Sequence, residues 1–282
     1  MDGGRLKDAV LPILIFVIVT LIGISAGRLL RDRKKRYFAA CEYWVFLPDE
    51  VLPGQDGVMT YVVGNNPHGR PIGPREGILF SDVRLHVALV LRAKNPHVFR
   101  PDLFGGNVEI SKETLAALPR AASLAKVRYA SDVPLSDNRH LQFMPHLADA
   151  YAQLGNAVAV YDAVTEQLWT RDEFHALVGA DRDAARPEMQ VRIVWESTGT
   201  HSQAFSKGLI KQGMPEIISA EAQSDLEALL LTLITEAAHT IFGRGSMQDV
   251  ERVACYGDTF ELTLQPERDG KRVINVVRIQ AT

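Results

Sequence analysis

The stretch from Ala9 to Gly27 constrains this chain more than any other, because it contains 19 residues and no charge. The core of a bilayer is about 30 Å thick and requires roughly 20 apolar residues in a helix. Extending the stretch to Leu30 meets this length and adds one charge, Arg28. Backbone in lipid must satisfy its own hydrogen bonds, so we expect a single transmembrane helix over residues 9–30.

Positive charges gather on the C-terminal side of this stretch. Arg5 and Lys7 precede it. The six that end or follow it are Arg28, Arg31, Arg33, Lys34, Lys35 and Arg36. Because Lys and Arg stay preferentially on the cytoplasmic side, this asymmetry predicts an N-terminus outside and a C-terminal domain in the cytoplasm. The same six side chains are placed to contact anionic lipid headgroups. An uncleaved anchor with the domain facing outward is the alternative.

Two glycines near the end of the predicted span, Gly23 and Gly27, lie four residues apart. This spacing of small residues lets two membrane helices approach closely, so it is a candidate for helix packing between copies of the chain. Short motifs of this kind also occur by chance, which is the alternative interpretation. The sequence therefore leaves a homo-oligomer open without requiring one.

Charge divides the chain into a basic N-terminal segment and an acidic body. Residues 1–36 hold eight Lys or Arg and three Asp, a net charge of +5. Because the whole chain carries −3, the remaining 246 residues carry −8. Proteins bind nucleic acid largely by neutralising phosphates with clustered Lys and Arg, so an acidic body argues against nucleic acid as a partner. The expected partners are the membrane and a protein located at it.

The chain divides into a short tail (1–8), the predicted span, a basic juxtamembrane segment (31–36) and a soluble domain (37–282). Apolar alternation and short apolar runs predict strands at 58–63, 83–91, 125–130, 157–161, 191–195, 260–264 and 273–279. Helices are predicted at 111–119, 145–154, 170–179 and 225–242. Because helices and strands interleave without a strict βαβ rhythm, we expect an α+β fold with a mixed sheet covered by helices. Division of the domain into two α/β halves, about 40–165 and 166–282, is an alternative.

Two of these helices have clear boundaries in the sequence. Thr170 and Glu173 form a capping box at the start of the shorter one, and Gly179 ends it. Ser224 and Glu227 form another capping box at the start of the long helix. Apolar residues recur along the long helix at steps of three and four, so we expect it to pack across a sheet.

No complete catalytic or metal-binding motif is present: the chain has no Walker loop, H-E-x-x-H, C-x-x-C or G-x-S-x-G. The sequence therefore predicts no cofactor and no metal. The strongest candidate for chemistry is Thr198–His201, because polar loops after strands often hold ligands in folds that combine helices and sheets. His201 could act as an acid or a base, with Glu216 as a second candidate. A hydrogen-bonding role for His201 is the alternative, since no nucleophile accompanies it.

His140, His146 and Asp149 form the other close set of polar residues. His146 and Asp149 are three residues apart and share one face of a predicted helix. Zinc usually requires three or four ligands, so two on one face do not make a site. We therefore expect these side chains to have a structural role.

Three segments occur in a recognisable order before the long helix: Asp162–Trp169, Thr200–His201 and Lys207–Glu216. This order resembles an uncharacterised bacterial domain family, over about residues 157–242. Members of that family carry a Thr-His-Gly…Phe-Gly-Pro-Glu type of segment between a sheet and a helix. The resemblance implies a bacterial α+β domain, and with the predicted span it places the chain in the bacterial inner membrane. It implies no activity.

We therefore expect a single-pass membrane protein whose cytoplasmic domain is an interaction or regulatory module. A tether raises the local concentration of a domain near its membrane partners and requires no active site. One alternative is a membrane-tethered hydrolase with a pocket around Thr198–His201. Another is a structural subunit of a membrane assembly that packs through Gly23 and Gly27.

Overall fold

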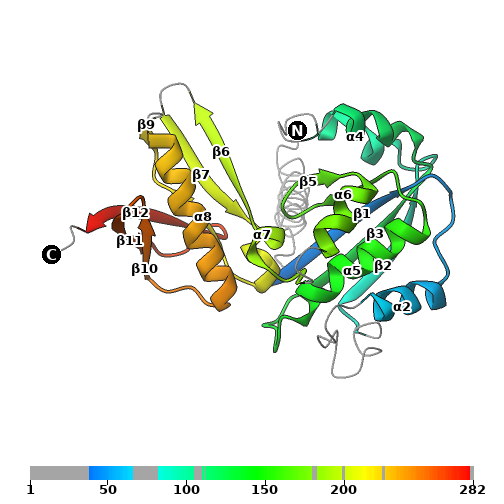
Figure 1. The fold of residues 1–282 in the computed structure, drawn as a ribbon, viewed down its shortest axis with the longest axis horizontal. Helices are drawn as coiled ribbons and strands as arrows, with labels where there is room; N and C mark the ends of the chain where they lie inside the picture. Colours follow the sequence, from blue (N-terminus) through cyan, green and yellow to red (C-terminus); the bar gives the residue numbers. More distant parts are fainter. Residues whose placement is uncertain are drawn as a thin grey trace, which may run out of the picture. The chain divides into compact units, whose positions relative to one another are not determined.

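The strands form two separate sheets, called sheet A and sheet B below (Figure 1). The structure is a computed structural model that describes residues 38–65, 82–104, 110, 112–179, 183–198, 201–223 and 226–279. All strands of sheet A lie between Ala39 and Trp169, and all strands of sheet B lie between Arg192 and Ile279.

Sheet A is wholly antiparallel and has the strand order β2-β3-β1-β4-β5. Its strands are β1 (Ala39–Leu47), β2 (Leu85–Leu91), β3 (Ser123–Ser131), β4 (Ala159–Asp162) and β5 (Gln167–Trp169). Alternate residues of β1, among them Tyr43 and Val45, are buried beneath the helices. Phe46, whose side chain points to the other side of the strand, is buried on the opposite face of sheet A. Sheet A therefore has an apolar core on both faces.

Helix α5 (Arg139–Leu154) lies across one face of sheet A, with α2 (Gln55–Gly64) and α6 (Arg171–Gly179) beside it (Figure 1). Short helical segments cover part of the other face: η2 (Pro96–Phe99), η3 (Pro101–Leu103), α4 (Lys112–Ala117) and η4 (Leu118–Arg120). Thirteen of the 16 residues of α5 are buried. The core of sheet B also includes Leu141 of this helix, so α5 contributes to both cores.

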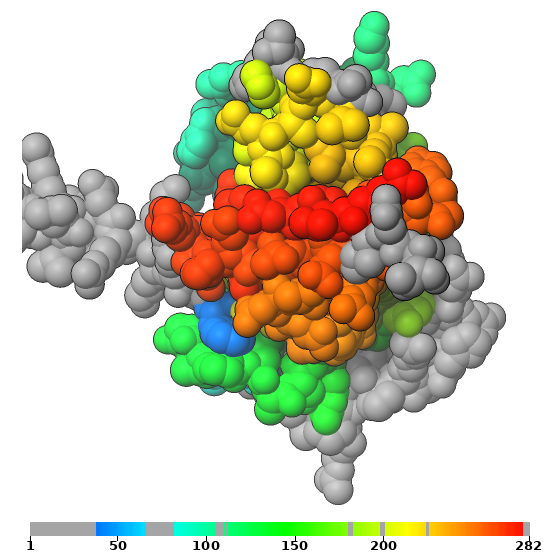
Figure 2. Space-filling model, turned by 90° about the vertical axis from the view of Figure 1, so that its left-hand side faces the viewer, coloured from blue at the N-terminus to red at the C-terminus, as the bar shows by residue number. Residues whose placement is uncertain are grey.

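Sheet B has the order β10-β11-β12-β8-β7-β6, with β9 paired to β7. Its strands are β6 (Arg192–Thr198), β7 (His201–Lys207), β8 (Glu216–Ser219), β9 (Ala222–Gln223), β10 (Val250–Cys255), β11 (Asp258–Leu264) and β12 (Lys271–Ile279). Helix α8 (Glu227–Arg244) covers one face, while α7 (Pro187–Gln190) and η6 (Leu209–Gln212) lie in the connections. Exposed residues alternate with buried ones along β10, so the other face of the sheet is open. Figure 2 shows β12 in red across the surface of sheet B.

The predicted architecture is wrong, although its α+β character is confirmed. We expected a single transmembrane helix followed by one mixed-sheet domain covered by helices. The chain instead leaves sheet A after β5 and starts a second sheet at β6, and the pairing of β8 with β12 is parallel. Among the residues that the structure describes, no helix is both long and apolar enough to cross a membrane. The predicted span at 9–30, its flanks, Gly23, Gly27 and the six basic residues lie outside the described residues.

Several elements predicted from local signals are confirmed. The capping box that starts α6 is present, since the amide of Thr170 donates to Glu173 at 2.8 Å and the amide of Glu173 donates to the Thr170 hydroxyl at 3.2 Å. The strands predicted at 260–264 and 273–279 correspond to β11 and β12, which pair as a hairpin. Its turn holds Asp269 and Gly270 at φ values of 52° and 78°, which favours these residue types.

Other local predictions are wrong because packing overrides propensity. Residues 58–63 lie in helix α2 rather than in a strand, since Val58 and Val62 are four residues apart and pack together into the core beneath α5. Helix α5 begins at Arg139 and contains Pro145 in its interior. Helix α8 has Leu226 at its N-cap with no capping side chain. Ser224 of the second predicted capping box lies outside the described residues.

Candidate functional site

A buried ion pair joins the parts of the chain that carry the two sheets. Lys211 in η6 lies 2.6 Å from Asp162 at the end of β4, and neither side chain is exposed. The Lys211 ammonium also donates to Oε1 of Gln190 in α7 at 2.9 Å. We call Asp162, Gln190 and Lys211 the junction. Removing two charges from water costs free energy, so each partner depends on the other.

A proline inside α5 leaves a main-chain carbonyl free to accept a hydrogen bond from Gln190. Pro145 has no amide hydrogen, so the carbonyl of Leu141 lacks its usual helical partner. Nε2 of Gln190 donates to that carbonyl at 3.1 Å and to the carbonyl of Ala184 at 2.6 Å. Both the oxygen and the nitrogen of the Gln190 side-chain amide therefore form hydrogen bonds. Through Gln190 the junction is linked to α5, the helix that contributes to both cores.

The junction also fixes the turn between β4 and β5. Oδ1 of Asp162 accepts from the amides of Val164 at 2.9 Å and Thr165 at 3.2 Å. The turn ends with Glu166 in the left-handed region at φ 59°. Nη1 of Arg192, at the start of β6, donates to the carbonyl of Glu166 at 3.0 Å. The Asp162 carboxylate thus binds Lys211 and also stabilises the β4–β5 turn, which contacts Arg192 of sheet B.

Two potentially reactive groups beneath the junction are kept protonated. Burial raises the pKa of the Cys41 thiol to about 12. Burial, followed by the negative charge of Asp162, raises the pKa of the Tyr43 phenol well above its usual range. Because a thiol and a phenol are weak nucleophiles until they ionise, this arrangement favours a structural role for the junction.

His140 links α5 to the same region. Its Nε2 donates to the carbonyl of Lys211 at 2.7 Å, and its ring stacks on Tyr129 with centroids 4.7 Å apart. Nδ1 is buried and has no hydrogen-bond partner among the described residues. Burial therefore lowers the pKa of His140 to about 4, because the charged form would leave an N–H without an acceptor.

This shifted pKa predicts a loss of stability in acid. The unfolded histidine binds its proton near pH 6.5 and the folded one near pH 4, so the unfolding free energy falls as the pH drops below about 6.5. At pH 4 the expected loss is about 3 kcal/mol. Urea denaturation between pH 7 and pH 4 measures it. In His140→Gln, which keeps a donor for Lys211 but does not titrate, this component should vanish, and equal pH slopes for the two proteins would contradict the assignment.

The two predicted catalytic residues lie near opposite ends of strand β7, His201 on β7 itself and Glu216 on β8. His201 is exposed at the start of β7 and pairs with Thr198 across a two-residue hairpin connection. Glu216 contacts Ser206, near the end of β7, where the hydroxyl donates to the carboxylate at 2.6 Å. His201 and Ser206 are five residues apart on a strand, about 16 Å. The structure therefore does not bring His201 and Glu216 together, and the hydrolase hypothesis stays an untested prediction.

Glu216 instead stabilises the connection that carries Lys211. Its carboxylate accepts from the amides of Gly208 at 2.8 Å, Ile210 at 3.2 Å and Leu209 at 3.3 Å. Burial raises the pKa of Glu216, and these hydrogen bonds act in the opposite direction. Gly208 is at φ 127°, and a Cβ there would lie 2.1 Å from the carbonyl oxygen of Gln190. Only glycine permits this close approach.

The polar set of His140, His146 and Asp149 is divided among different contacts. His146 lies 3.0 Å from Nε2 of Gln142, while the buried Asp149 lies 2.9 Å from Nδ1 of His175 on α6. In the part of the chain that the structure describes, no group of three or more His, Cys, Asp or Glu side chains could hold a metal ion. No local pattern in the sequence indicates the pairing of Asp149 with His175, because it depends on how α5 and α6 pack.

Strand β2 is an edge of sheet A and is solvent-exposed. Its residues Leu85–Leu91 carry no acidic or basic side chain except His86. Val87 is 38% exposed and Leu89 is 37% exposed. Among the described strands, β2 pairs with β3 alone. The sequence predicted this strand from its alternation, but its exposure could not be read from that pattern.

The main-chain groups of β2 alternate in direction. The amide of Arg92 donates to the segment that precedes β3 at 2.9 Å, and the carbonyl of Arg84 accepts from β3 at 3.1 Å. Even-numbered residues therefore point their main-chain groups toward β3. The amides of Val87 and Leu89 consequently point away from the sheet, as on an edge that can accept another strand.

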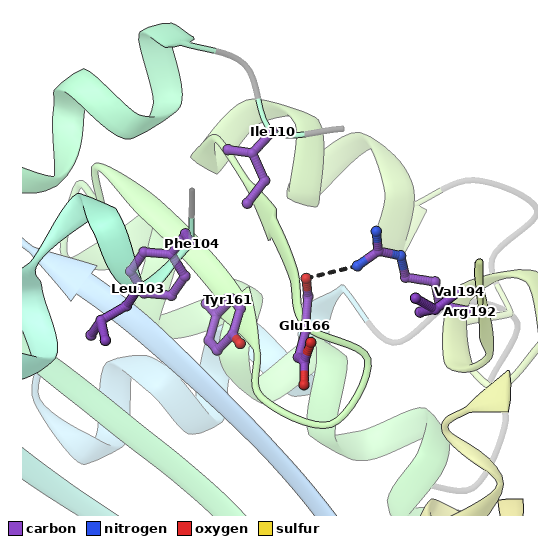
Figure 3. Close-up of a pocket in the computed structure, with 7 residues that line it drawn as sticks. All are labelled: Leu103, Phe104, Ile110, Tyr161, Glu166, Arg192 and Val194. Atoms are coloured by element: carbon purple, nitrogen blue, oxygen red, sulfur yellow. Dashed lines mark hydrogen bonds between the residues drawn. The ribbon is translucent and has the colours of Figure 1, made fainter. Parts of the chain in front are cut away.

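A pocket of about 370 Å³ lies between the β4–β5 turn and β6 (Figure 3). It is lined by Leu103, Phe104, Ile110, Tyr161, Glu166, Arg192 and Val194. These residues come from three distant segments of the sequence, so no local motif marks the pocket. A second pocket, of about 570 Å³, includes Glu113, Arg120 and Arg171. His201 lines neither of them.

No family model, curated protein or solved structure matches the chain. The resemblance to a bacterial domain family therefore stays a prediction from the sequence.

Proposed function

We propose that this chain is a protein-interaction domain that pairs with an extended segment of a partner along β2. One observation carries the proposal: the edge strand Leu85–Leu91 is exposed, almost uncharged, and directs main-chain amides away from its sheet. Soluble proteins usually protect such an edge with charges, prolines or bulges, because it pairs readily with another strand. Strand addition uses the main chain for affinity and side-chain contacts for specificity.

Charge favours a partner segment with acidic flanks. Arg84 before the strand forms an ion pair with Asp82 at 2.6 Å, whereas Arg92 and Lys94 follow the strand at its C-terminal end. Opposite charges that face each other across a strand pair stabilise it. We therefore infer that the partner segment carries Asp or Glu at the end that faces Arg92 and Lys94.

The site of this interaction is proposed to be the cytoplasmic face of a membrane. This proposal is supported by the sequence alone, through the uncharged stretch and the six basic residues that end or follow it. Anionic lipid attracts such a cluster by about 1 kcal/mol per residue near the surface. Membrane association would raise the concentration of the domain around a partner in the same membrane.

A proline at position 87 is expected to remove the interaction and leave the fold intact. Val87→Pro deletes an outward amide and preserves the pairing with β3. Tagged full-length protein and this variant would be purified from soluble and detergent-solubilised membrane fractions, with partners quantified by mass spectrometry. We expect at least a tenfold loss of an acidic partner from the membrane fraction, and a melting temperature changed by less than about 4 °C, the shift expected for roughly 1 kcal/mol.

Two further variants serve as controls. Val250→Pro makes the same change on the edge of β10, where Val250 is 41% exposed and Asp249 supplies the carbonyl that faces β11. It should retain the partner. Ala88→Pro removes an amide that faces β3 and should lower the melting temperature. Equal recovery of every protein by the original chain and Val87→Pro would contradict the proposed function, and recovery only from the soluble fraction would contradict the membrane location.

A further inference from the structure

We propose that His175 is a phosphoryl-acceptor site, modified at Nε2 by a donor with a phosphorus–nitrogen bond, such as the phosphohistidine of another protein. The proposal starts from a buried carboxylate, that of Asp149, which lies 2.9 Å from Nδ1 of an exposed imidazole. The Asp149 side chain is 3% exposed, whereas the His175 side chain is 52% exposed. This inference is independent of the β2 interaction, because it rests on other residues.

Two further side chains hold the Asp149 carboxylate in place. Asp149 lies on α5, and its Oδ2 accepts from the Tyr61 hydroxyl of α2 at 3.2 Å. Nε2 of Gln153, one turn further along α5, donates to Oδ1 at 3.4 Å. Burial, followed by the negative charge of Asp149, raises the pKa of Tyr61, so the phenol keeps the proton that it donates. The carboxylate therefore meets His175 of α6 in a fixed position.

The contact with Asp149 selects one form of the neutral imidazole. A carboxylate only accepts hydrogen bonds, so Nδ1 of His175 carries the ring hydrogen and Nε2 holds the free lone pair. Among the described residues, Nε2 of His175 makes no hydrogen bond. The nucleophilic nitrogen is thus the one that remains available, on an exposed side chain that another protein can reach.

Phosphoryl transfer to this nitrogen requires no proton to move on the histidine. The lone pair of Nε2 forms a bond to phosphorus while the phosphorus–nitrogen bond of the donor breaks, and the donor nitrogen leaves with that electron pair. Because Nδ1 keeps its hydrogen, the His175 ring becomes positively charged as the new bond forms. Asp149 stabilises this charge, as the aspartate of a Ser-His-Asp triad stabilises its imidazolium.

The exposed position favours a phosphoryl group over an acyl group, although histidine accepts both. Acyl imidazoles hydrolyse rapidly in water, whereas a phosphorus–nitrogen bond persists long enough for the group to be transferred again. Two other carboxylates near the start of α6 have partners of their own: Asp172 lies 2.9 Å from Arg171, and Glu173 accepts from Thr170. Asp149 is therefore the carboxylate that acts on the His175 ring.

Potassium phosphoramidate, a small donor with the same type of bond, tests the proposal on the full chain. Mass spectrometry of peptides kept at alkaline pH measures the rate at each histidine, with the exposed His86 and His97 as internal references. We expect His175 to react at least tenfold faster than either, and phosphorus NMR to place its phosphoryl group on Nε2. Equal rates at the three histidines, or attachment to Nδ1 of His175, would overturn the proposal, and neither readout requires a substitution.

Substitutions identify the source of the reactivity. Asp149→Asn should lower the rate at His175 at least tenfold and leave the two reference histidines unchanged, because it removes the charge that stabilises the phosphorylated ring. Glu173→Gln removes a carboxylate of the same helix that contacts Thr170 rather than His175, so it is the matched control with no expected effect. An unchanged rate at His175 in Asp149→Asn, or an equal fall in Glu173→Gln, would contradict the role of Asp149.

Discussion

Replacing Lys211 by methionine is expected to destabilise the protein by about 3–5 kcal/mol, the largest effect that the structure predicts for a single side chain. The substitution leaves the Asp162 carboxylate fully buried without its partner. It also removes the donor to Gln190 at 2.9 Å. Methionine fills much of the same space, so the loss would measure the uncompensated charge rather than a cavity.

A double variant separates the charge from the packing. Asp162→Asn keeps an oxygen for the amides of Val164 and Thr165 and removes the negative charge. Combined with Lys211→Met, it should recover at least 2 kcal/mol of the loss, because no buried charge remains. Urea denaturation of the two single variants and the double variant gives the coupling energy. A double variant as unstable as the sum of the single ones would contradict a direct interaction.

A partly exposed ion pair between Glu166 of the same turn and Lys207 of β7 provides the comparison. Lys207 pairs with Glu166, whose side chain is 52% exposed. Water screens such a pair, so Lys207→Met should cost less than about 1 kcal/mol. If both lysine substitutions had the same small effect, the proposed importance of the junction would be wrong.

The junction also shows why this fold was only partly predictable from the sequence. Local signals were sufficient where a few neighbouring residues determine the backbone, as in the Thr170–Glu173 capping box and the Asp269-Gly270 turn. The pairing of Asp162 with Lys211 joins residues 49 positions apart and leaves no local pattern. The sequence therefore left the division into two halves as an alternative to one mixed sheet, because contacts of this kind decide between them.

Burial explains the main errors in local structure. Residues 58–63 are rich in β-branched side chains, yet Val58 and Val62 pack as successive turns of a helix beneath α5. Pro145 predicted a helix start, but Gln190 satisfies the carbonyl that the proline leaves free, so the helix continues through it. In both places a distant residue determines the local conformation.

The candidate sites were predicted only in part, for a similar reason. His201 and Glu216 were predicted as candidates because they follow a predicted strand in the sequence. The direction in which each side chain points depends on how the strands pair, and the sequence does not show that pairing. Glu216 faces the amides of its own connection, and the pocket near Arg192 combines three separate segments. The strand at β2 was predicted, whereas its place at an exposed edge depends on the order of all five strands.

Removing the Glu216 side chain is expected to be the second most damaging change. Glu216→Ala takes away the acceptor of the amides of Gly208, Leu209 and Ile210, and of the Ser206 hydroxyl. A buried donor left without an acceptor costs about 1–3 kcal/mol, and partial access to water reduces the sum. We expect a loss of about 4 kcal/mol in urea denaturation. Hydrogen exchange at the freed amides should accelerate, because they lose their protection.

Glutamine at this position distinguishes a structural anchor from a catalytic acid. Glu216→Gln keeps one oxygen for the amides and should recover about half of the loss, since the second acceptor is replaced by a donor. Glu261→Ala, which removes a partly exposed partner of the exposed Arg252 on the same sheet, should cost less than about 1 kcal/mol. Catalytic carboxylates are commonly held at some expense of stability, so an unchanged or increased unfolding free energy in Glu216→Ala would favour the enzymatic alternative. A graded loss from Glu261→Ala through Glu216→Gln to Glu216→Ala would instead show that Glu216 serves to hold the connection that places Lys211 against Asp162.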